Sequence, residues 1–243
     1  MKRDYKIEKE KRVSFIRELL ERSGAKGIVY GNSGGKDSAL VGALCKAACE
    51  NTVGIIMPCE SVRNFNMDKK DGLTVANFYG IETREADITP IKSAVKCALA
   101  NATELSVSAD VNINPRLRMT VLYAVAASEG RLVCGTGNRS EAYLGYFTKW
   151  GDGAYDFNPI SDLTVTEIYE FLEYLDCPKC VIEKAPSAGL YDGQTDESEM
   201  GISYAEVDNY LLNGVAGEKA LAEIEKRHSA SEHKRNNPTT YEN

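Results

Sequence analysis

Long apolar segments are absent from this sequence. No stretch approaches the roughly 20 consecutive apolar residues that a membrane-spanning helix requires, so we expect no membrane association. The first six residues are mostly charged and lead into further charged residues instead of an apolar segment. We therefore expect no secretory signal and a cytoplasmic location.

Cysteine is too sparse for a disulfide scaffold. The seven cysteines are an odd number and are spread along the chain without dense spacing, which fits a reducing compartment. Cys177 and Cys180 form one Cys-x-x-Cys pair, but both histidines, His228 and His233, lie far downstream. Because one such pair supplies only half of a structural zinc site, we interpret it as structural or incidental.

The sequence also has no excess of basic residues. Its 29 lysines and arginines are outnumbered by 36 acidic residues, which gives a formal charge of −7. A large nucleic-acid interface requires a concentrated basic surface. We therefore expect no nucleic-acid partner.

Short apolar runs alternate with segments of helical composition over the first 135 residues. The predicted strands are 27–30, 52–57, 83–88 and 131–135, and the predicted helices are 4–23, 37–50, 66–79, 90–100 and 116–129. Such alternation predicts βαβ units. The expected fold is one α/β domain over residues 1–243, with a doubly wound, mainly parallel sheet and helices on both faces.

The second half contains a long polar segment. Residues 184–203 hold three glycines and many acidic residues but few apolar ones, so we expect a mobile loop that acts as a lid. Helical composition returns at 204–213 and 217–228, and residues 234–243 are expected to form a polar tail.

A glycine-rich segment joins the first predicted strand to the next helix. Its residues are Gly31, Asn32, Ser33, Gly34, Gly35, Lys36, Asp37 and Ser38. Glycines let backbone N–H groups approach phosphate oxygens, the helix N-terminus adds partial positive charge, and the carboxylate of Asp37 suits Mg²⁺. The spacing excludes the GxxxxGK[ST] and GxGxxG motifs. A plain glycine turn with a capping side chain is the simpler alternative, but the order of residues favours a nucleotide phosphate site.

The pattern Ser-Gly-Gly-x-Asp-Ser resembles the pyrophosphate loop of the N-type ATP pyrophosphatases, which form adenylates and have a Rossmann-like fold. Further segments resemble the ammonia-dependent NAD synthetases of that superfamily. They are residues 114–119, 135–141, 145–159, 184–190, 193–197 and 233–235. The resemblance extends from about residue 5 to 235.

This resemblance implies the ATP-dependent amidation of deamido-NAD by ammonia. The nicotinate carboxylate would attack the α-phosphorus of ATP, pyrophosphate would leave, and ammonia would displace AMP to give NAD. Phosphates of both nucleotides crowd one site, so Mg²⁺ and cationic side chains are needed. Amide transfer from glutamine would need an activated cysteine in a further domain, so free ammonia is the expected donor. The family also implies a homodimer with deamido-NAD at the subunit interface.

The resemblance assigns site residues position by position. The Mg²⁺ ligands would be Asp37 and Glu141. ATP would contact residues 31–38, Thr136 and Ser187. Deamido-NAD would contact Arg116, Lys149, Asp156, His233 and Lys234. The catalytic residues would be Asp37, Lys149 and Asp156, the last because its carboxylate could accept a proton from ammonium.

Simpler interpretations exist for several of these residues. Glu141 could merely favour a helix N-terminus through its charge. Lys149 and His233 could be solvated surface residues, and one of Arg116 and Arg118, which lie two positions apart on a helix, could be structural.

Two positions depart from the family pattern. Family members often carry a lysine near the ATP phosphates where Val165 stands here, and a threonine where Ser187 stands. Lys36, at the variable position of the loop, brings a cation near phosphate and could compensate for the absent lysine.

Two other functions fit the glycine-rich loop. One is a different adenylating pyrophosphatase, for instance one that acts on tRNA, and the negative charge of the chain argues against it. The other is a non-catalytic adenine-nucleotide-binding protein. The paired Mg²⁺ ligand candidates Asp37 and Glu141 argue against that function, because binding alone needs no such pair.

Overall fold

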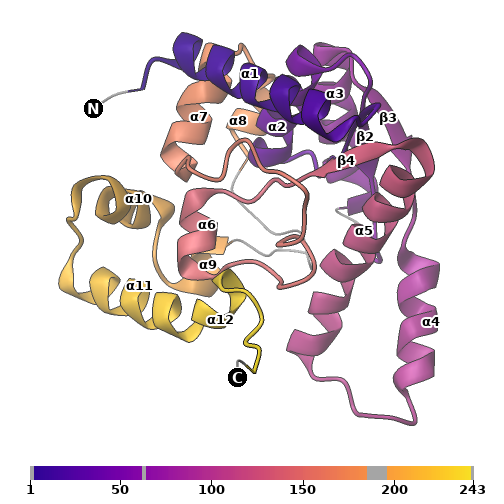
Figure 1. Ribbon diagram of the computed structural model, residues 1–243. Helices are drawn as coiled ribbons and strands as arrows, with labels where there is room; N and C mark the ends of the chain where they lie inside the picture. Colours follow the sequence, from indigo (N-terminus) through magenta and orange to yellow (C-terminus); the bar gives the residue numbers. More distant parts are fainter. Residues whose placement is uncertain (1–2, 62–63, 185–195, 242–243) are drawn as a thin grey trace.

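A four-stranded parallel sheet forms the centre of the protein (Figure 1). The computed structural model describes residues 3–61, 64–184 and 196–241. The strands are β1 (Gly27–Gly31), β2 (Thr52–Ile56), β3 (Glu82–Glu85) and β4 (Arg131–Cys134), in the order β3-β2-β1-β4. All neighbouring pairs are parallel because helices return the chain to the same end of the sheet. The predicted doubly wound α/β class is confirmed.

Helices cover both faces of the sheet. One face is covered by α1 (Tyr5–Ser23), α2 (Lys36–Ala48), α3 (Lys69–Tyr79), α7 (Val165–Tyr174) and α8 (Lys179–Ile182). The other is covered by α5 (Val107–Glu129), with α4 (Thr89–Leu99) beside it. Strand β1 alternates accordingly: Ile28 and Tyr30 pack in the α2 core, and Val29 packs in the α5 core. None of the helices in the described part of the chain is long and apolar enough to cross a membrane.

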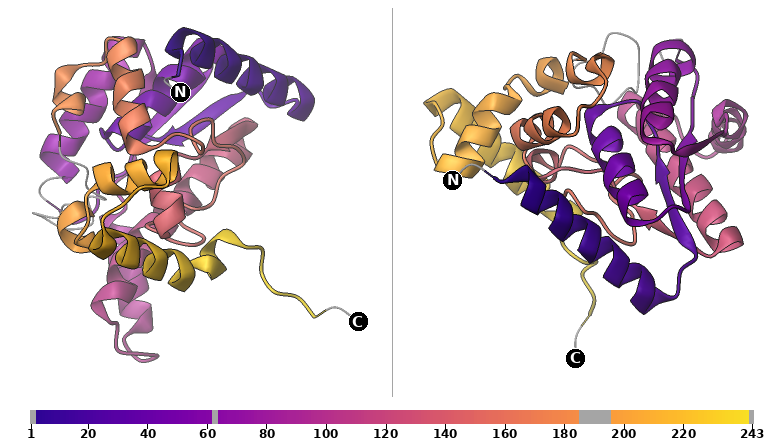
Figure 2. Two further views of the ribbon diagram at one scale, coloured as in Figure 1. Left: turned by 90° about the vertical axis from the view of Figure 1, so that its left-hand side faces the viewer. Right: turned by 90° about the horizontal axis from the view of Figure 1, so that it is seen from above.

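The C-terminal helices form a separate cluster beside the sheet (Figure 2). They are α6 (Arg139–Leu144), α9 (Asp196–Met200), α10 (Tyr204–Asn213), α11 (Glu218–Ala230) and α12 (Glu232–Arg235). Leu144, Val207 and Ile224 bury their side chains in this cluster. It attaches to the sheet through α7, whose residue Val165 belongs to the same apolar group.

The carboxyl ends of β1, β2 and β4 lie at one edge of the sheet, at Gly31, Ile56 and Cys134. Phe157 forms a parallel bridge with Cys134 and accepts a hydrogen bond from Gly135 N at 2.8 Å. Ligands bind at this edge in open α/β sheets because the chain leaves the layer there and opens a crevice. The glycine-rich segment and residues 135–138 both begin at this edge.

Helices α5 and α7 both differ from the predictions. Helix α5 begins at Val107, ahead of the predicted start at residue 116, because Ser106 caps it by accepting a hydrogen bond from Ala109 N at 3.2 Å. Pro115 lies inside the helix and packs against Gly151 instead of starting the helix. Helix α7 was not predicted, although Thr164 and Glu167 form a capping box at its start.

The predicted loop over 184–203 is wrong for residues 196–200, which form α9. The acidic composition of this segment suggested exposed residues, but Asp196 and Met200 are both buried and hold α9 in place. The middle of the predicted mobile loop, including Ser187, lies outside the described residues. One π-helical segment, η1 (Asn64–Asp68), leads into α3.

The predicted polar tail begins later than residue 234. Lys234 and Arg235 belong to α12, and both donate hydrogen bonds to backbone carbonyls at the end of α6 and in the segment that follows it. Extended chain begins at residue 236. Basic residues near the end of a chain read as solvated in a sequence, yet here they satisfy carbonyls that a helix terminus leaves without partners.

Candidate active site

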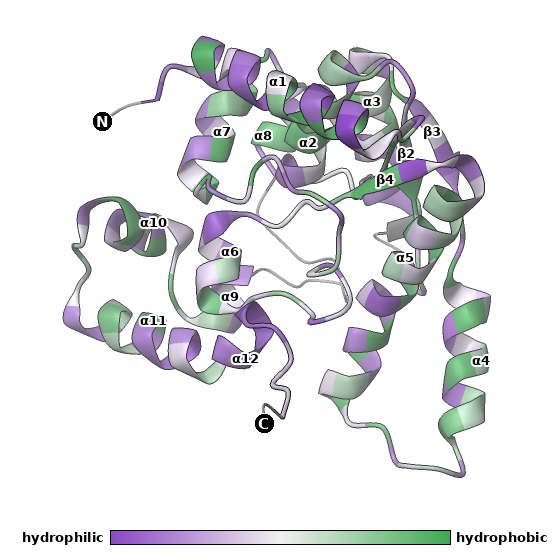
Figure 3. Cartoon of the chain, in the orientation of Figure 1, coloured by the Kyte–Doolittle hydropathy of each residue, from purple (hydrophilic) through white to green (hydrophobic). Residues whose placement is uncertain are grey.

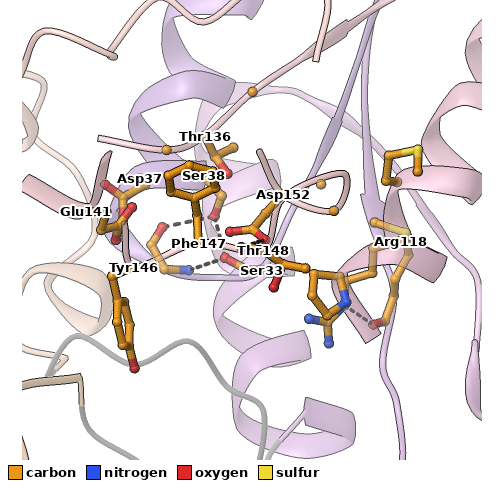
Figure 4. A pocket seen from close by; sticks show the side chains of 18 of the residues that line it. Ser33, Asp37, Ser38, Arg118, Thr136, Glu141, Tyr146, Phe147, Thr148 and Asp152 are labelled. Carbon is orange, nitrogen blue, oxygen red and sulfur yellow. Dashed lines mark hydrogen bonds between the residues drawn. The ribbon is translucent and has the colours of Figure 1, made fainter. Parts of the chain in front are cut away.

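A pocket of about 850 Å³ opens at the carboxyl edge of the sheet. Its walls come from the glycine-rich segment, the end of β2, one side of α5, residues 133–137 and residues 145–154. Figure 4 shows Asp37 and Glu141 side by side at one end of this pocket and Arg118 at the other end. The pocket is therefore long enough to present two chemically different ends to a ligand.

The glycine-rich segment is held in shape by Asn32. Its side chain accepts a hydrogen bond from Gly34 N at 3.3 Å and donates one to Gly72 O at 2.9 Å. Gly34 has φ +70°, and a Cβ built on it would lie 2.4 Å from Asp68 O. Glycine is required at this position both for the backbone conformation and for the close approach to the start of α3.

The two serines of the segment form a small hydrogen-bond chain. Ser33 Oγ donates to Ser38 Oγ at 3.1 Å, and Ser38 Oγ donates to Gly35 O at 3.0 Å. Gly35 N donates to Ser33 Oγ at 3.3 Å. The segment thus ends in the first turn of α2 with its hydroxyl groups on the pocket wall, and Thr136 lines the pocket from the end of β4.

Asn138 brings Asp37 and Glu141 together from helices a hundred residues apart in sequence. Its buried side chain donates to Asp37 Oδ1 at 3.0 Å, and its backbone N–H donates to Glu141 Oε2 at 3.3 Å. Asn138 Oδ1 in turn accepts from Glu141 N at 2.9 Å, which completes the capping box of α6. Glu141 therefore does serve a helix N-terminus, as the simpler interpretation holds, and it also faces Asp37 across the pocket end.

Lys36 lies between these carboxylates. Its Nζ is 2.7 Å from Asp37 Oδ2 and 3.9 Å from Glu141 Oε1. Burial alone would lower the pKa of Lys36, but the two carboxylates outweigh burial and raise it. Burial and the charge of Asp37 raise the pKa of Glu141 to about 8, against the opposing effect of Lys36. An ionised pair at this position therefore calls for more positive charge than Lys36 supplies.

The donor set at this end fits Mg²⁺. Two carboxylates present oxygen atoms to one point, and Mg²⁺ is usually held by one or two carboxylates together with substrate phosphates. No group of three or more histidine, cysteine or acidic side chains that could hold a metal occurs in residues 3–61, 64–184 and 196–241. The phosphates would therefore complete the coordination of an ion held by Asp37 and Glu141.

Arg118 lines the other end of the pocket, and Asp152 lines the pocket between the two ends. Arg118 Nε donates to Met57 O at 3.3 Å, and Asp152 Oδ1 accepts from Thr148 N at 2.9 Å. Arg116 is exposed and does not line the pocket. Sequence reasoning singled out Arg116 and passed over Asp152. Residues two positions apart on a helix point in different directions. The sequence therefore indicated that Arg116 and Arg118 differ in role but not which of them faces the pocket.

Besides Arg116, three predicted substrate residues lie outside the pocket. Lys149 donates to the backbone carbonyl of His233 and lies 5.4 Å from the centre of the Trp150 ring. His233 is itself exposed. Asp156 is exposed too, and accepts hydrogen bonds from Tyr123 Oη at 3.1 Å and Val133 N at 2.7 Å.

Lys234 is the member of the predicted deamido-NAD set that lines the pocket. Its Nζ donates to Gly145 O and Phe147 O, both at 2.8 Å. Val165, at the position where the resemblance led us to expect a lysine, is buried in the C-terminal cluster and does not line the pocket.

A model of the NAD synthase family matches residues 8–238. The chain belongs to the NAD synthase family. It is 44% identical over 241 residues to the NH(3)-dependent NAD(+) synthetase of Carboxydothermus hydrogenoformans, covering 98% of each chain. The family match over residues 8–238 includes every segment that lines the pocket described above.

Two solved structures are similar to this chain. The NMN synthetase of Francisella tularensis superposes with a TM-score of 0.94 at 37% identity, covering 99% of both chains. The NH3-dependent NAD synthetase of Campylobacter jejuni superposes with a TM-score of 0.82 at 31% identity, covering 99% of this chain and 100% of that one.

Proposed function

We propose that this NAD synthase catalyses the ATP-dependent amidation of deamido-NAD by ammonia through an acyl-adenylate, giving NAD, AMP and pyrophosphate. One observation carries the proposal: a glycine-rich phosphate segment and the Asp37–Glu141 pair meet at one end of a pocket whose other end presents Arg118. The curated relatives that match nearly the whole chain are named for the ammonia-dependent reaction.

The phosphate end of the pocket suits ATP. The N-terminus of α2, which follows the glycine-rich segment, provides N–H donors and partial positive charge. Asp37 and Glu141 would hold Mg²⁺, which when bound neutralises phosphate charge and makes pyrophosphate a better leaving group. Thr136 and the hydroxyl groups of Ser33 and Ser38 orient the nucleotide from the sides.

The opposite end suits the second nucleotide. Arg118 lines this end, and Lys234 also lines the pocket. Cations are the usual partners of phosphate and carboxylate groups. The nicotinate carboxylate would enter between the two ends, where it can reach the α-phosphorus. Exclusion of water from this part of the pocket when both substrates are bound would protect an adenylate from hydrolysis.

We expect ¹⁸O from the nicotinate carboxylate of deamido-NAD to appear in AMP. Attack by a carboxylate oxygen on the α-phosphorus, followed by displacement by ammonia, leaves that oxygen on the phosphate of AMP. The measurement is mass spectrometry of the products after incubation with ATP, Mg²⁺ and ammonium. Label in orthophosphate would indicate attack on the γ-phosphorus and would reject the proposed reaction.

The proposed nitrogen donor is ammonia. Cys134 lines the pocket, but burial and the neighbouring Cys45 raise the pKa of its thiol well above the ordinary value, the opposite of what a nucleophilic cysteine needs. His228 is occupied with the carbonyl of Tyr143 at 2.9 Å. The pocket therefore offers no activated cysteine among the residues that the structure describes.

The purified chain should accordingly form NAD with ammonium and remain inactive with glutamine freed of ammonia. At a fixed total ammonium concentration, the rate should rise with pH because the fraction present as NH₃ increases. Initial rates of NAD formation from pH 6.5 to 8.5 would test this. Equal rates with glutamine alone would contradict it, and a rate that falls steadily with pH would also count against it.

We also propose that the functional unit is a homodimer. Helix α5 buries only three of its 23 residues, Asn114, Pro115 and Ala126, and α4 buries only Lys92. Both helices contain apolar residues (green in Figure 3), and the side chains of Ile91 in α4 and Val107 in α5 are exposed. Arg116 lies on this part of α5, and Asp156 is bonded to Tyr123 of the same helix. A second copy packed here would place these predicted substrate residues at a shared site.

A second candidate substrate is nicotinate mononucleotide. The TM-score of 0.94 to the Francisella tularensis NMN synthetase favours it, since amidation of that mononucleotide would yield NMN by the same chemistry. Both reactions use ATP, ammonia and the same phosphate end of the pocket. The ratio of kcat/KM for deamido-NAD and nicotinate mononucleotide, measured in one assay of AMP release, decides between them.

A further inference from the structure

Lys36 occupies the point at which two carboxylates converge. Asp37 and Glu141 each have one oxygen bonded to Asn138, at 3.0 and 3.3 Å. Their other oxygens, Asp37 Oδ2 and Glu141 Oε1, face Lys36 Nζ at 2.7 and 3.9 Å. A divalent cation bound by both carboxylates would use these same two oxygens. The side-chain ammonium group of Lys36 and the metal ion therefore compete for one position.

The ammonium group of Lys36 lies in the interior of the site and not on the solvated surface. Lys36 is only 6% exposed, and its Nζ lies 5.6 Å from the centre of the Tyr204 ring. Lysine is seldom buried to this degree without an anionic partner. Lys46, on the same helix, shows the ordinary arrangement, since it pairs with the exposed side chain of Glu50.

Other lysines that line the pocket are held by groups that a metal ion would leave in place. Lys184 binds Asp68 and Asp71 at 2.8 and 2.7 Å. Lys234 binds backbone carbonyls. Lys36 differs because both of its partners are the predicted metal ligands, so it loses its acceptors when a metal ion takes them.

We propose that Lys36 exchanges places with the metal ion: it holds Asp37 and Glu141 together in the free enzyme and moves to the ATP phosphates when the ion binds. The identity of the phosphate ligand rests on the proposed function. The exchange itself rests on the geometry. Two carboxylates balance a divalent ion, so an ammonium left beside it would be repelled. Lys36 lies in the first turn of α2, directly after Gly35, and its flexible stem lets its head turn toward phosphates above the glycine-rich segment.

The exchange gives Lys36→Met two effects of opposite sign. Methionine keeps an unbranched stem of similar length but carries no charge. Without a competing ammonium, Mn²⁺ used as the probe should bind the nucleotide-free variant at least about tenfold more tightly than the unaltered protein. Without a lysine to receive the phosphates, ATP with Mg²⁺ should bind at least about tenfold more weakly. Isothermal titration calorimetry measures both affinities. A residue that only supports the fold would weaken both.

Lys46→Met is the matched control, and neither affinity should change in it. Mn²⁺ binding to Lys36→Met that is unchanged or weaker would overturn the exchange. If the variant is less stable, its melting temperature should still rise more steeply with Mn²⁺ than that of the unaltered protein, and a smaller rise would overturn the proposal. The Mn²⁺ measurement uses no deamido-NAD or ammonia. If Lys36→Met binds Mn²⁺ more tightly but the unaltered protein forms no NAD, the exchange stands and the proposed function is rejected. If the unaltered protein forms NAD but Lys36→Met does not bind Mn²⁺ more tightly, the proposed function stands and the exchange is rejected.

Discussion

Asp37→Asn and Glu141→Gln should each lower turnover at least about a hundredfold, the scale of losing one preorganised electrostatic contact in an active site. Both substitutions keep the shape of the side chain and remove its charge. Asn138 can still hydrogen-bond the oxygen of either amide side chain, so the convergence of α2 and α6 should survive. The measurement is kcat at saturating ATP and deamido-NAD over a range of Mg²⁺ concentrations.

Glu206→Gln is the control for the helix-capping role of Glu141. Glu206 occupies the equivalent position in the capping box of α10, where it accepts from Ser203 N at 2.9 Å, but it lies on the surface. Its replacement should leave kcat within about twofold, because Gln also serves a capping box. Near-native turnover in Glu141→Gln at saturating Mg²⁺ would reject Glu141 as a metal ligand, and the same holds for Asp37→Asn.

Gly34→Ala should impair both stability and ATP binding. An alanine at φ +70° costs about 1–3 kcal/mol, and its Cβ would lie 2.4 Å from Asp68 O. The segment must then shift, which misdirects the N–H groups that face the phosphates. Loss of one hydrogen bond to a charged group is worth about 1.5–3 kcal/mol, so we expect ATP affinity to fall at least about tenfold. Chemical denaturation and calorimetric titration with ATP measure the two effects.

Two other glycines separate the causes of this effect. Gly214 has φ +71° with nothing within 4 Å of a built Cβ, so Gly214→Ala reports the backbone conformation alone and should leave ATP affinity unchanged. Gly35 has φ −96°, and its built Cβ meets only Ser33 Oγ at 3.4 Å. Gly35→Ala should therefore destabilise the protein less than Gly34→Ala. If Gly34→Ala is no worse than Gly214→Ala in stability, the close approach to α3 has no energetic role.

The parallel sheet was predictable because its strands are short, apolar and separated by helical segments. β1 reads as a buried run from Gly27 to Tyr30, and the breaks after Tyr30 and Cys134 mark two carboxyl ends of strands. The α5 start was mispredicted because Pro115 is usually a helix-start signal. The sequence near Pro115 does not reveal that this proline, inside the helix, packs against Gly151.

The site residues were predicted from different kinds of information. Residues 31–38 indicate a phosphate-binding segment because they combine glycines with a helix start, and both of these features are local. The placement of Glu141 beside Asp37 depends on Asn138, whose buried amide spans the two helices. The sequence around residues 139–141 does not indicate which other helix α6 will face.

The sequence by itself determined the α/β class, the phosphate segment and the family resemblance, because periodicity, glycine spacing and residue order act over a few residues at a time. Only the tertiary structure decided which side chains share the pocket. It placed Arg118 on the pocket wall and Arg116 on the outer surface, buried Val165 in the C-terminal cluster, and set Lys36 between Asp37 and Glu141. These outcomes depend on how helices distant in sequence pack at one sheet edge. That packing buries Lys36, in the first turn of α2, between two carboxylates.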